Sequence, residues 1–158
     1  MKNASADGFL ASYRAPANAQ GANANVVISA MNCMPMICPE LTAASWKKNE
    51  DNLKMKLSQA LKDNPALVFD IADATVDGKP AVSVYALSFV STTDATGTSR
   101  ASTHAYDIYW HDGARFVTVG VNAGATGAQS LEEFVQKMPK ADLEALAKKA
   151  LGVVLAEL

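Results

Sequence analysis

The pattern of apolar and polar residues between positions 81 and 122 predicts a three-stranded antiparallel meander at the centre of the fold. Residues 81–90, 103–110 and 115–121 are rich in β-branched and aromatic residues, which favours strands. Between the last two runs lies the pair Asp112 and Gly113, which tolerates the positive φ of a tight hairpin turn. The meander therefore joins strands that follow one another in the chain.

Three more strands are predicted before the meander. In residues 9–15 the alternation places Phe9, Ala11 and Tyr13 on one face, and Pro16 ends the strand. Residues 26–31 and 66–71 have similar apolar patterns. The total is about six strands.

The helices are predicted in two blocks. A central helix begins near Thr42 or Ser45 and stops before Pro65. Its buried stripe has helical spacing and consists of Trp46, Leu53, Leu57 and Leu61. At the C-terminal end, Ser130 and Glu133 form a capping-box pattern ahead of a short helix that Pro139 closes, and a longer apolar-faced helix follows from Asp142.

Strands in sequential order with helices in separate blocks indicate an α+β domain, in which an antiparallel sheet packs against the central helix and the C-terminal helices. The chain of 158 residues shows no repeat or composition break, so we expect a single domain over residues 1–158. Residues 1–8 are expected to form a flexible N-terminus. The polar segment 91–102 is expected to be a loop between two strands of the meander.

Composition and charge narrow the function classes. A net charge of −2 argues against nucleic-acid binding, and no apolar run approaches the length of a membrane span. The N-terminus has no apolar segment typical of a signal peptide, and we expect that the initiator methionine has replaced an export signal. Loops rich in Ala, Ser, Thr and Asn, together with two close cysteines, favour a periplasmic or secreted protein.

The segment from Met31 to Cys38 is the unusual cluster in the sequence. Thiolate and thioether sulfurs suit Cu(I), so Cys33, Met34, Met36 and Cys38 are candidate ligands of a copper site. The spacing of the two cysteines matches no zinc or thioredoxin motif. A disulfide between Cys33 and Cys38 is ranked first, inert core residues second and the metal site third.

The polar residues His104, Asp107, His111 and Asp112 are weak candidates for catalysis. Strand alternation places His104 and Asp107 on opposite faces, while His111 and Asp112 belong to the predicted turn. Asp70 and Asp73 also diverge and do not form a carboxylate pair. The sequence lacks the usual hydrolase, zinc-protease and phosphate-loop motifs, so an enzyme with a dispersed site is the third hypothesis.

The aromatic residues of the strand at 103–110 offer another kind of site. Tyr106 and Trp110 share one face of that strand and Tyr109 takes the other. Whichever face the helices leave uncovered is a candidate interaction patch.

Two segments of the chain give it a family resemblance. Residues 77–81, Asp-Gly-Lys-Pro-Ala, enter a long strand, and residues 109–117, Tyr-Trp-His-Asp-Gly-Ala-Arg-Phe-Val, form a hairpin. With the order of the other elements, this pattern resembles the PsbP-like group, which includes bacterial DcrB-like envelope proteins. The resemblance implies a non-catalytic α+β module that binds a protein partner or assists assembly. The methionine–cysteine segment and the helices interrupted by Pro139 depart from that group, and no functional residue carries over.

The leading hypothesis is therefore a non-enzymatic bacterial envelope protein that binds a protein partner. Its candidate surfaces are the loop from Cys33 to Cys38, residues 91–102 and an exposed face of the sheet. Copper binding is the alternative.

Overall fold

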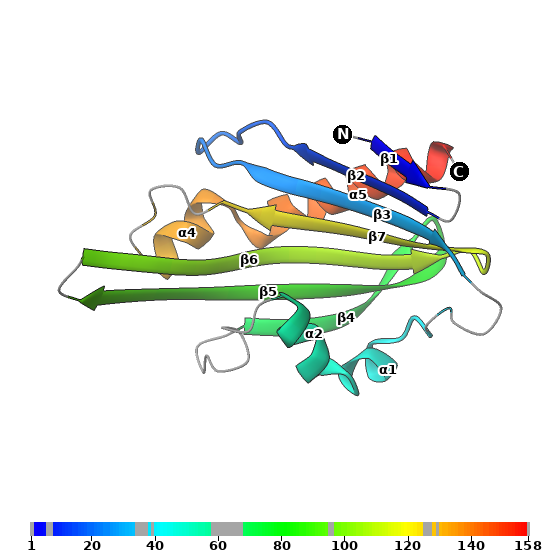
Figure 1. Cartoon of the computed structure of the whole chain (residues 1–158), viewed down its shortest axis with the longest axis horizontal. Coiled ribbons are helices and arrows are strands. Elements are labelled where there is room, and N and C mark those ends of the chain that lie inside the picture. Colours follow the sequence, from blue (N-terminus) through cyan, green and yellow to red (C-terminus); the bar gives the residue numbers. More distant parts are fainter. Residues whose placement is uncertain are drawn as a thin grey trace.

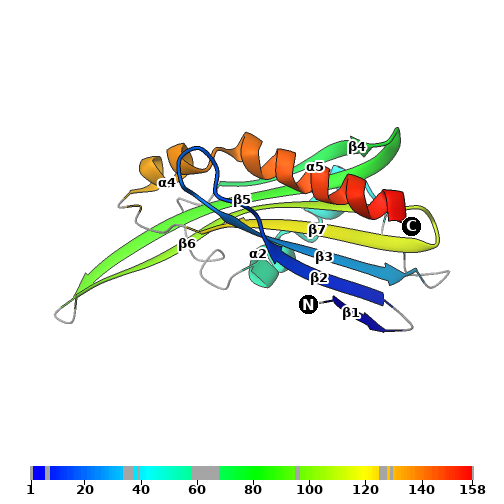
Figure 2. The ribbon, with the colours of Figure 1, turned by 90° about the horizontal axis from the view of Figure 1, so that it is seen from above.

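The fold is a single antiparallel sheet that carries helices on both faces (Figures 1 and 2). The structure is a computed structural model, which describes residues 2–5, 8–33, 38, 40–57, 68–94, 97–124, 128 and 130–157. Within these residues seven strands pair in the order β1-β2-β3-β7-β6-β5-β4. The predicted α+β class and antiparallel sheet are confirmed, with one strand more than expected.

The elements have the following bounds. The strands are β1 (Lys2–Ser5), β2 (Gly8–Arg14), β3 (Ala24–Asn32), β4 (Val68–Val76), β5 (Lys79–Asp94), β6 (Gly97–His111) and β7 (Arg115–Ala123). The helices of the described residues are α1 (Ala43–Lys47), α2 (Glu50–Leu57), α4 (Leu131–Lys137) and α5 (Lys140–Glu157).

The larger core lies between the sheet and the C-terminal helices. Helix α5 runs along one face of the sheet, over β7, β6 and β3 (Figure 2). Its residues Leu143, Ala147 and Leu151 are fully buried, and they belong to one cluster with Ile108 and Val119 of the sheet. The prediction that the apolar last helix lies on the meander is confirmed.

A smaller core occupies the opposite face. Helices α1 and α2 lie there (α2 is labelled in Figure 2), and the buried residues are Leu41, Ala43, Ile71, Val82 and Val84. These two helices are short and lie toward β4, β5 and β6, so residues of β3 and β2 on this face stay exposed.

Two tight turns fix the register of the long strands. Asp77 and Gly78 both have positive φ, 50° and 76°, as the type I′ turn between β4 and β5 requires. Gly113, with φ of 93°, turns β6 into β7. The hairpin predicted at Asp112 and Gly113 is confirmed.

The N-terminus departs from the prediction. Residues 1–8 were expected to be flexible, whereas Lys2–Ser5 forms β1 and pairs antiparallel with β2. Without β1, the outer edge of β2 would leave its backbone N–H and C=O groups unpaired. Strand β1 pairs with these groups through its backbone, which requires no apolar pattern in its sequence.

The polar segment 91–102 also departs from the prediction. Strand β5 continues to Asp94 and β6 begins at Gly97, so the ladder pairs Ser91 with Arg100 where a loop was expected. The ribbon extends beyond the other strands in Figure 1. Backbone pairing does not depend on apolar side chains, and threonine favours extended backbone. One candidate partner surface is therefore a β-ribbon.

Up to residue 57, where the described part of this segment ends, the predicted central helix is divided into two helices. Thr42 caps α1 as expected, since its hydroxyl accepts a hydrogen bond from the Ser45 N–H at 3.2 Å. The Asn49 N–H then bonds to the Trp46 carbonyl three residues back, which closes α1, and α2 starts anew at Glu50. Leu61 and the side chain of Leu57 lie outside the described residues.

Candidate functional site

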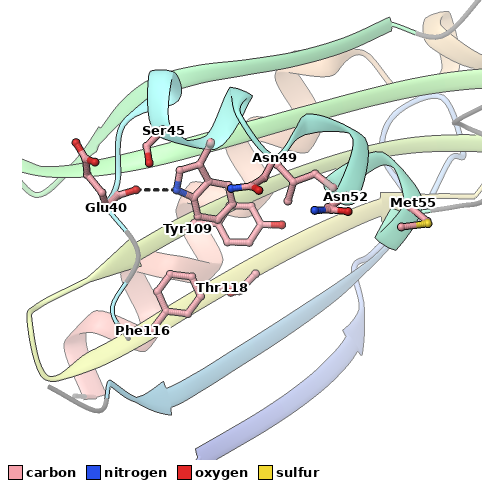
Figure 3. A pocket seen from close by; sticks show the side chains of 10 residues that line it. Glu40, Ser45, Asn49, Asn52, Met55, Tyr109, Phe116 and Thr118 are labelled. Carbon is pink, nitrogen blue, oxygen red and sulfur yellow. Dashed lines mark hydrogen bonds between the residues drawn. The ribbon is translucent and has the colours of Figure 1, made fainter. Parts of the chain in front are cut away.

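A groove lies between helices α1 and α2 and the sheet strands β6 and β7 (Figure 3). Its volume is about 720 Å³, within the range of ligand-binding pockets. Its apolar side is formed by Trp46, Leu53, Met55, Tyr109 and Phe116. Its polar side is formed by Glu40, Ser45, Asn49, Asn52 and Thr118.

Helix α1 is fixed above the sheet by polar contacts at its first turn. The Ala43 N–H donates to a carboxylate oxygen of Asp73 on β4, at 2.6 Å. The Trp46 indole N–H donates to the Glu40 carbonyl at 2.8 Å, drawn as the dashed line in Figure 3. These bonds hold the indole ring over the sheet, where it forms the roof of the groove.

Three aromatic rings form a row through the groove. The Trp46 and Tyr109 ring centroids are 4.3 Å apart, and those of Tyr109 and Phe116 are 6.2 Å apart with nearly parallel planes. Tyr109 lies on β6 and Phe116 on β7, on the face opposite α5. The row therefore gives the groove a rigid, apolar and polarisable wall.

The groove opens onto an exposed apolar strip, which consists of Leu10, Val27 and Met31. Met31 on β3 lies directly across from Phe116, and its side chain is 49% exposed. Val27, four register pairs further along β3, lies across from Gly120, and Leu10 continues the strip onto β2. Because cross-strand partners share a face, the strip and the groove form one surface.

Asp107 lies at the inner end of this surface, next to Tyr109 along β6. Its side chain is 8% exposed and leans over Gly120, where an added Cβ would lie 2.8 Å from the carboxylate. The Tyr109 hydroxyl donates to it at 3.2 Å. Burial raises the pKa of Asp107 to about 6, against the opposing effect of that hydrogen bond.

His104 lies on the other face of β6, beneath α4. It is 1% exposed, its Nε2 is 3.0 Å from the Tyr85 hydroxyl, and its ring meets Phe134 edge-on at 5.1 Å. Burial lowers the pKa of His104 to about 4, so the ring is neutral near pH 7. The sheet separates His104 from Asp107, as the alternation predicted, and the two form no joint site.

His111 and Asp112 have turn roles, as expected. The Asp112 carboxylate accepts hydrogen bonds from the Arg115 and Ala114 N–H groups, and these two bonds lower its pKa to about 2. The His111 ring accepts from the Gly113 N–H at 3.1 Å. Both side chains stabilise the β6–β7 turn.

Asp70 and Asp73 diverge as the alternation predicted. Asp70 approaches Lys140 of α5 at 3.4 Å, whereas Asp73 binds the start of α1 on the opposite face.

Cys33 and Cys38 form a disulfide, the interpretation ranked first, with Cα atoms 5.3 Å apart. They are the two cysteines of the sequence, so this form of the protein has no thiolate for Cu(I). Met34 and Met36 lie outside the described residues. Within the described part of the chain, no group of three or more His, Cys, Asp or Glu residues is placed to bind a metal ion.

Replacing both Cys33 and Cys38 by serine is expected to lower the free energy of unfolding by about 2 kcal/mol, because the disulfide closes a short loop in the unfolded chain. Urea unfolding of the two proteins measures this difference. The intact mass of the wild-type protein, prepared without reductant, should be two hydrogens lower than that of the reduced protein. Added Cu(I) should leave this mass unchanged. Stoichiometric copper uptake by the oxidised protein would contradict this account.

Sequence reasoning found only part of the groove. The sequence placed Trp46 in the buried stripe of a helix and Tyr109 on one face of a strand, without showing whether a helix covers that face. In the structure the two rings lie together. Phe116 and Thr118 were missed, although they alternate with the fully buried Val117 and Val119 and so mark the second face of β7. No pattern in the sequence indicated that Glu40, Asn49 and Asn52 belong to a site.

The comparisons with known proteins gave no match: no family model, curated protein or solved structure matches the chain. The resemblance to the PsbP-like group therefore stays a prediction. In the described part of the chain, no helix combines the length and apolar character needed to cross a membrane.

Proposed function

We propose that this protein is a non-enzymatic envelope protein that binds an apolar segment of a partner protein in the groove between α1, α2 and the sheet. The observation that carries the proposal is the continuity of the groove with the exposed strip of Leu10, Val27 and Met31. Together they form an uncovered apolar surface, which is typical of an interaction site.

The side chains of the groove favour a protein partner over a small polar substrate. Tyrosine, tryptophan and methionine are enriched at the centres of protein interfaces, and Tyr109, Trp46 and Met55 all line the groove. Asn49 and Asn52 add adaptable hydrogen-bonding groups on the rim. An apolar side chain of the partner would insert beside the aromatic row and act as an anchor.

The extended strip favours a peptide segment over an isolated side chain. A segment that enters the groove can continue over β7 and β3 and cover Met31 and Val27, which are otherwise exposed to water. Burial of that additional apolar area would stabilise the complex.

The disulfide supports an oxidising compartment such as the periplasm or the extracellular space. An envelope location remains part of the proposal, together with the assembly role that the family resemblance implies.

Selection of a displayed random 12-residue peptide library on the oxidised protein tests the proposed function. We expect enrichment of peptides with aromatic or aliphatic residues, and one of them is then synthesised for titration. Met55→Lys and Met31→Lys should weaken its binding about tenfold or more, since each puts a charge into the apolar surface. Both methionines are about half exposed, at 47% and 49%, so the substitutions leave the core intact.

Val153→Lys is the matched control. Val153 is 57% exposed on α5, on the opposite face of the molecule, so this substitution should leave peptide binding unchanged. If no peptide is enriched, or if the control variant weakens binding as much as the two groove variants, the proposed function is wrong.

A further inference from the structure

Among the described residues that line the groove, one is acidic and none is basic. Glu40 is the charged residue of that lining, and Asp107 lies two register pairs beyond Tyr109 and Thr118, about 7 Å along the strand. On α2, Lys54 forms an ion pair with Glu50 and lies over the Phe69 ring, 5.3 Å from its centroid. Within the described residues, the surface therefore complements a cation.

The Asp107 carboxylate has unused hydrogen-bonding capacity. Within the described residues its hydrogen bond comes from the Tyr109 hydroxyl, whereas an ionised carboxylate can accept about four. Its cross-strand neighbours on β5 and β7 are Val84 and Gly120, which bring no donor side chain. A buried charge with so few partners is costly, and a cation from outside would offset part of that cost.

Gly120 leaves space for such a contact. Because this residue has no side chain, the carboxylate extends over β7 toward Val27, which is on the exposed strip. A Cβ at Gly120 would lie 2.8 Å from a carboxylate oxygen of Asp107, too close for the present position of that side chain. Asp107 is thus held at the boundary between the buried sheet face and the partner surface.

We propose that the partner segment carries a lysine or arginine beside its apolar anchor, and that this cation pairs with Asp107. The inference rests on the proposed function, because the anchor must occupy the groove to bring the cation within reach. The aromatic row adds to the attraction, since the faces of Trp46 and Tyr109 favour a nearby cation. In a water-excluding groove the ion pair is stronger than at an open surface.

The experiment compares peptide libraries selected on the wild-type protein and on the Asp107→Asn variant, both oxidised. We expect the wild type to enrich lysine or arginine at a fixed distance from the apolar anchor. Asp107→Asn should still enrich the anchor but lose the basic residue. For a synthetic peptide, changing its lysine to methionine should weaken wild-type binding about tenfold and binding to Asp107→Asn less than about twofold.

Two further variants locate the carboxylate that is responsible. Asp51→Asn removes an exposed acid of α2 that does not line the groove, so the basic preference should persist. Glu40→Gln removes the acid of the lining and should leave most of the preference. If apolar anchors are enriched without a basic residue, or if Asp107→Asn keeps the preference, the inference is wrong and the proposed function stands. If no peptide is enriched at all, the proposed function itself is wrong.

Discussion

Replacing Phe134 by alanine is expected to lower the free energy of unfolding by about 3 to 5 kcal/mol. Phe134 is 1% exposed and has the largest of the fully buried side chains in the described part of the chain. It connects α4 to the sheet, with its ring centroid 5.1 Å from that of His104 and 6.3 Å from that of Phe89. The helix holds it there because the Ser130 hydroxyl caps the first turn, accepting from the Glu133 N–H at 3.2 Å.

Urea unfolding followed by tryptophan fluorescence measures this loss, since Trp46 and Trp110 report on the two faces of the sheet. The matched control is Val153→Ala, an exposed position of α5, which should change stability by less than about 0.5 kcal/mol. If the Phe134 variant is no less stable than this control, α4 does not pack on the sheet as described.

Replacing Asp107 by asparagine is expected to raise the free energy of unfolding by about 2 to 3 kcal/mol near pH 7.5. The pKa of Asp107 is raised to about 6, from an ordinary value of 3.8. A raised pKa in the folded state means that the charged carboxylate is less stable there than in the unfolded chain. The wild type is therefore favoured below about pH 4 and loses this stability as the pH rises through 6.

Asparagine mimics the protonated acid and keeps an oxygen for the Tyr109 hydroxyl. The additional stability of the Asp107→Asn variant over the wild type should thus decrease as the pH is lowered and vanish near pH 4. Chemical unfolding of both proteins at several pH values measures it. His104, whose lowered pKa of about 4 makes the fold less stable as the pH drops below 6.5, is present in both proteins and cancels from the difference. A destabilised variant at pH 7.5 would contradict the burial argument.

The expected gain also bears on function. A residue that lowers the stability of the fold at neutral pH, where a similar side chain would raise it, is typical of a functional position. Asp107→Asn should therefore make the protein more stable and less selective for basic partner segments. The core variant Phe134→Ala should lower stability without a change of partner preference, because Phe134 lies on the opposite face of the sheet.

The sequence by itself determined most of the element order. Alternation in β5, β6 and β7 placed the meander correctly, and the apolar stripe of α5 required a sheet beneath it. The caps at Thr42 and Ser130 and the turn at Gly113 depend on neighbours within a few residues, so local chemistry was enough to find them. The opposite orientations of His104 and Asp107 followed from the two-residue period of a strand.

Elements without an apolar pattern were missed for one physical reason. Strand β1 and the outer ribbon of β5 and β6 are held by backbone hydrogen bonds, which are nearly independent of side-chain type. The break between α1 and α2 was missed because residues on either side of it have good helical spacing.

The groove was decided only by the tertiary structure. The groove brings together Trp46 of α1, Tyr109 of β6 and Phe116 of β7. In the helical and strand patterns of the sequence, none of these three differs from an ordinary apolar residue. Whether such a residue lies in the core or on a binding surface depends on how much of the sheet the helices cover. The two short helices α1 and α2 leave the β3 side of this face exposed. The apolar residues of that area are therefore available to bind a partner and do not belong to the core.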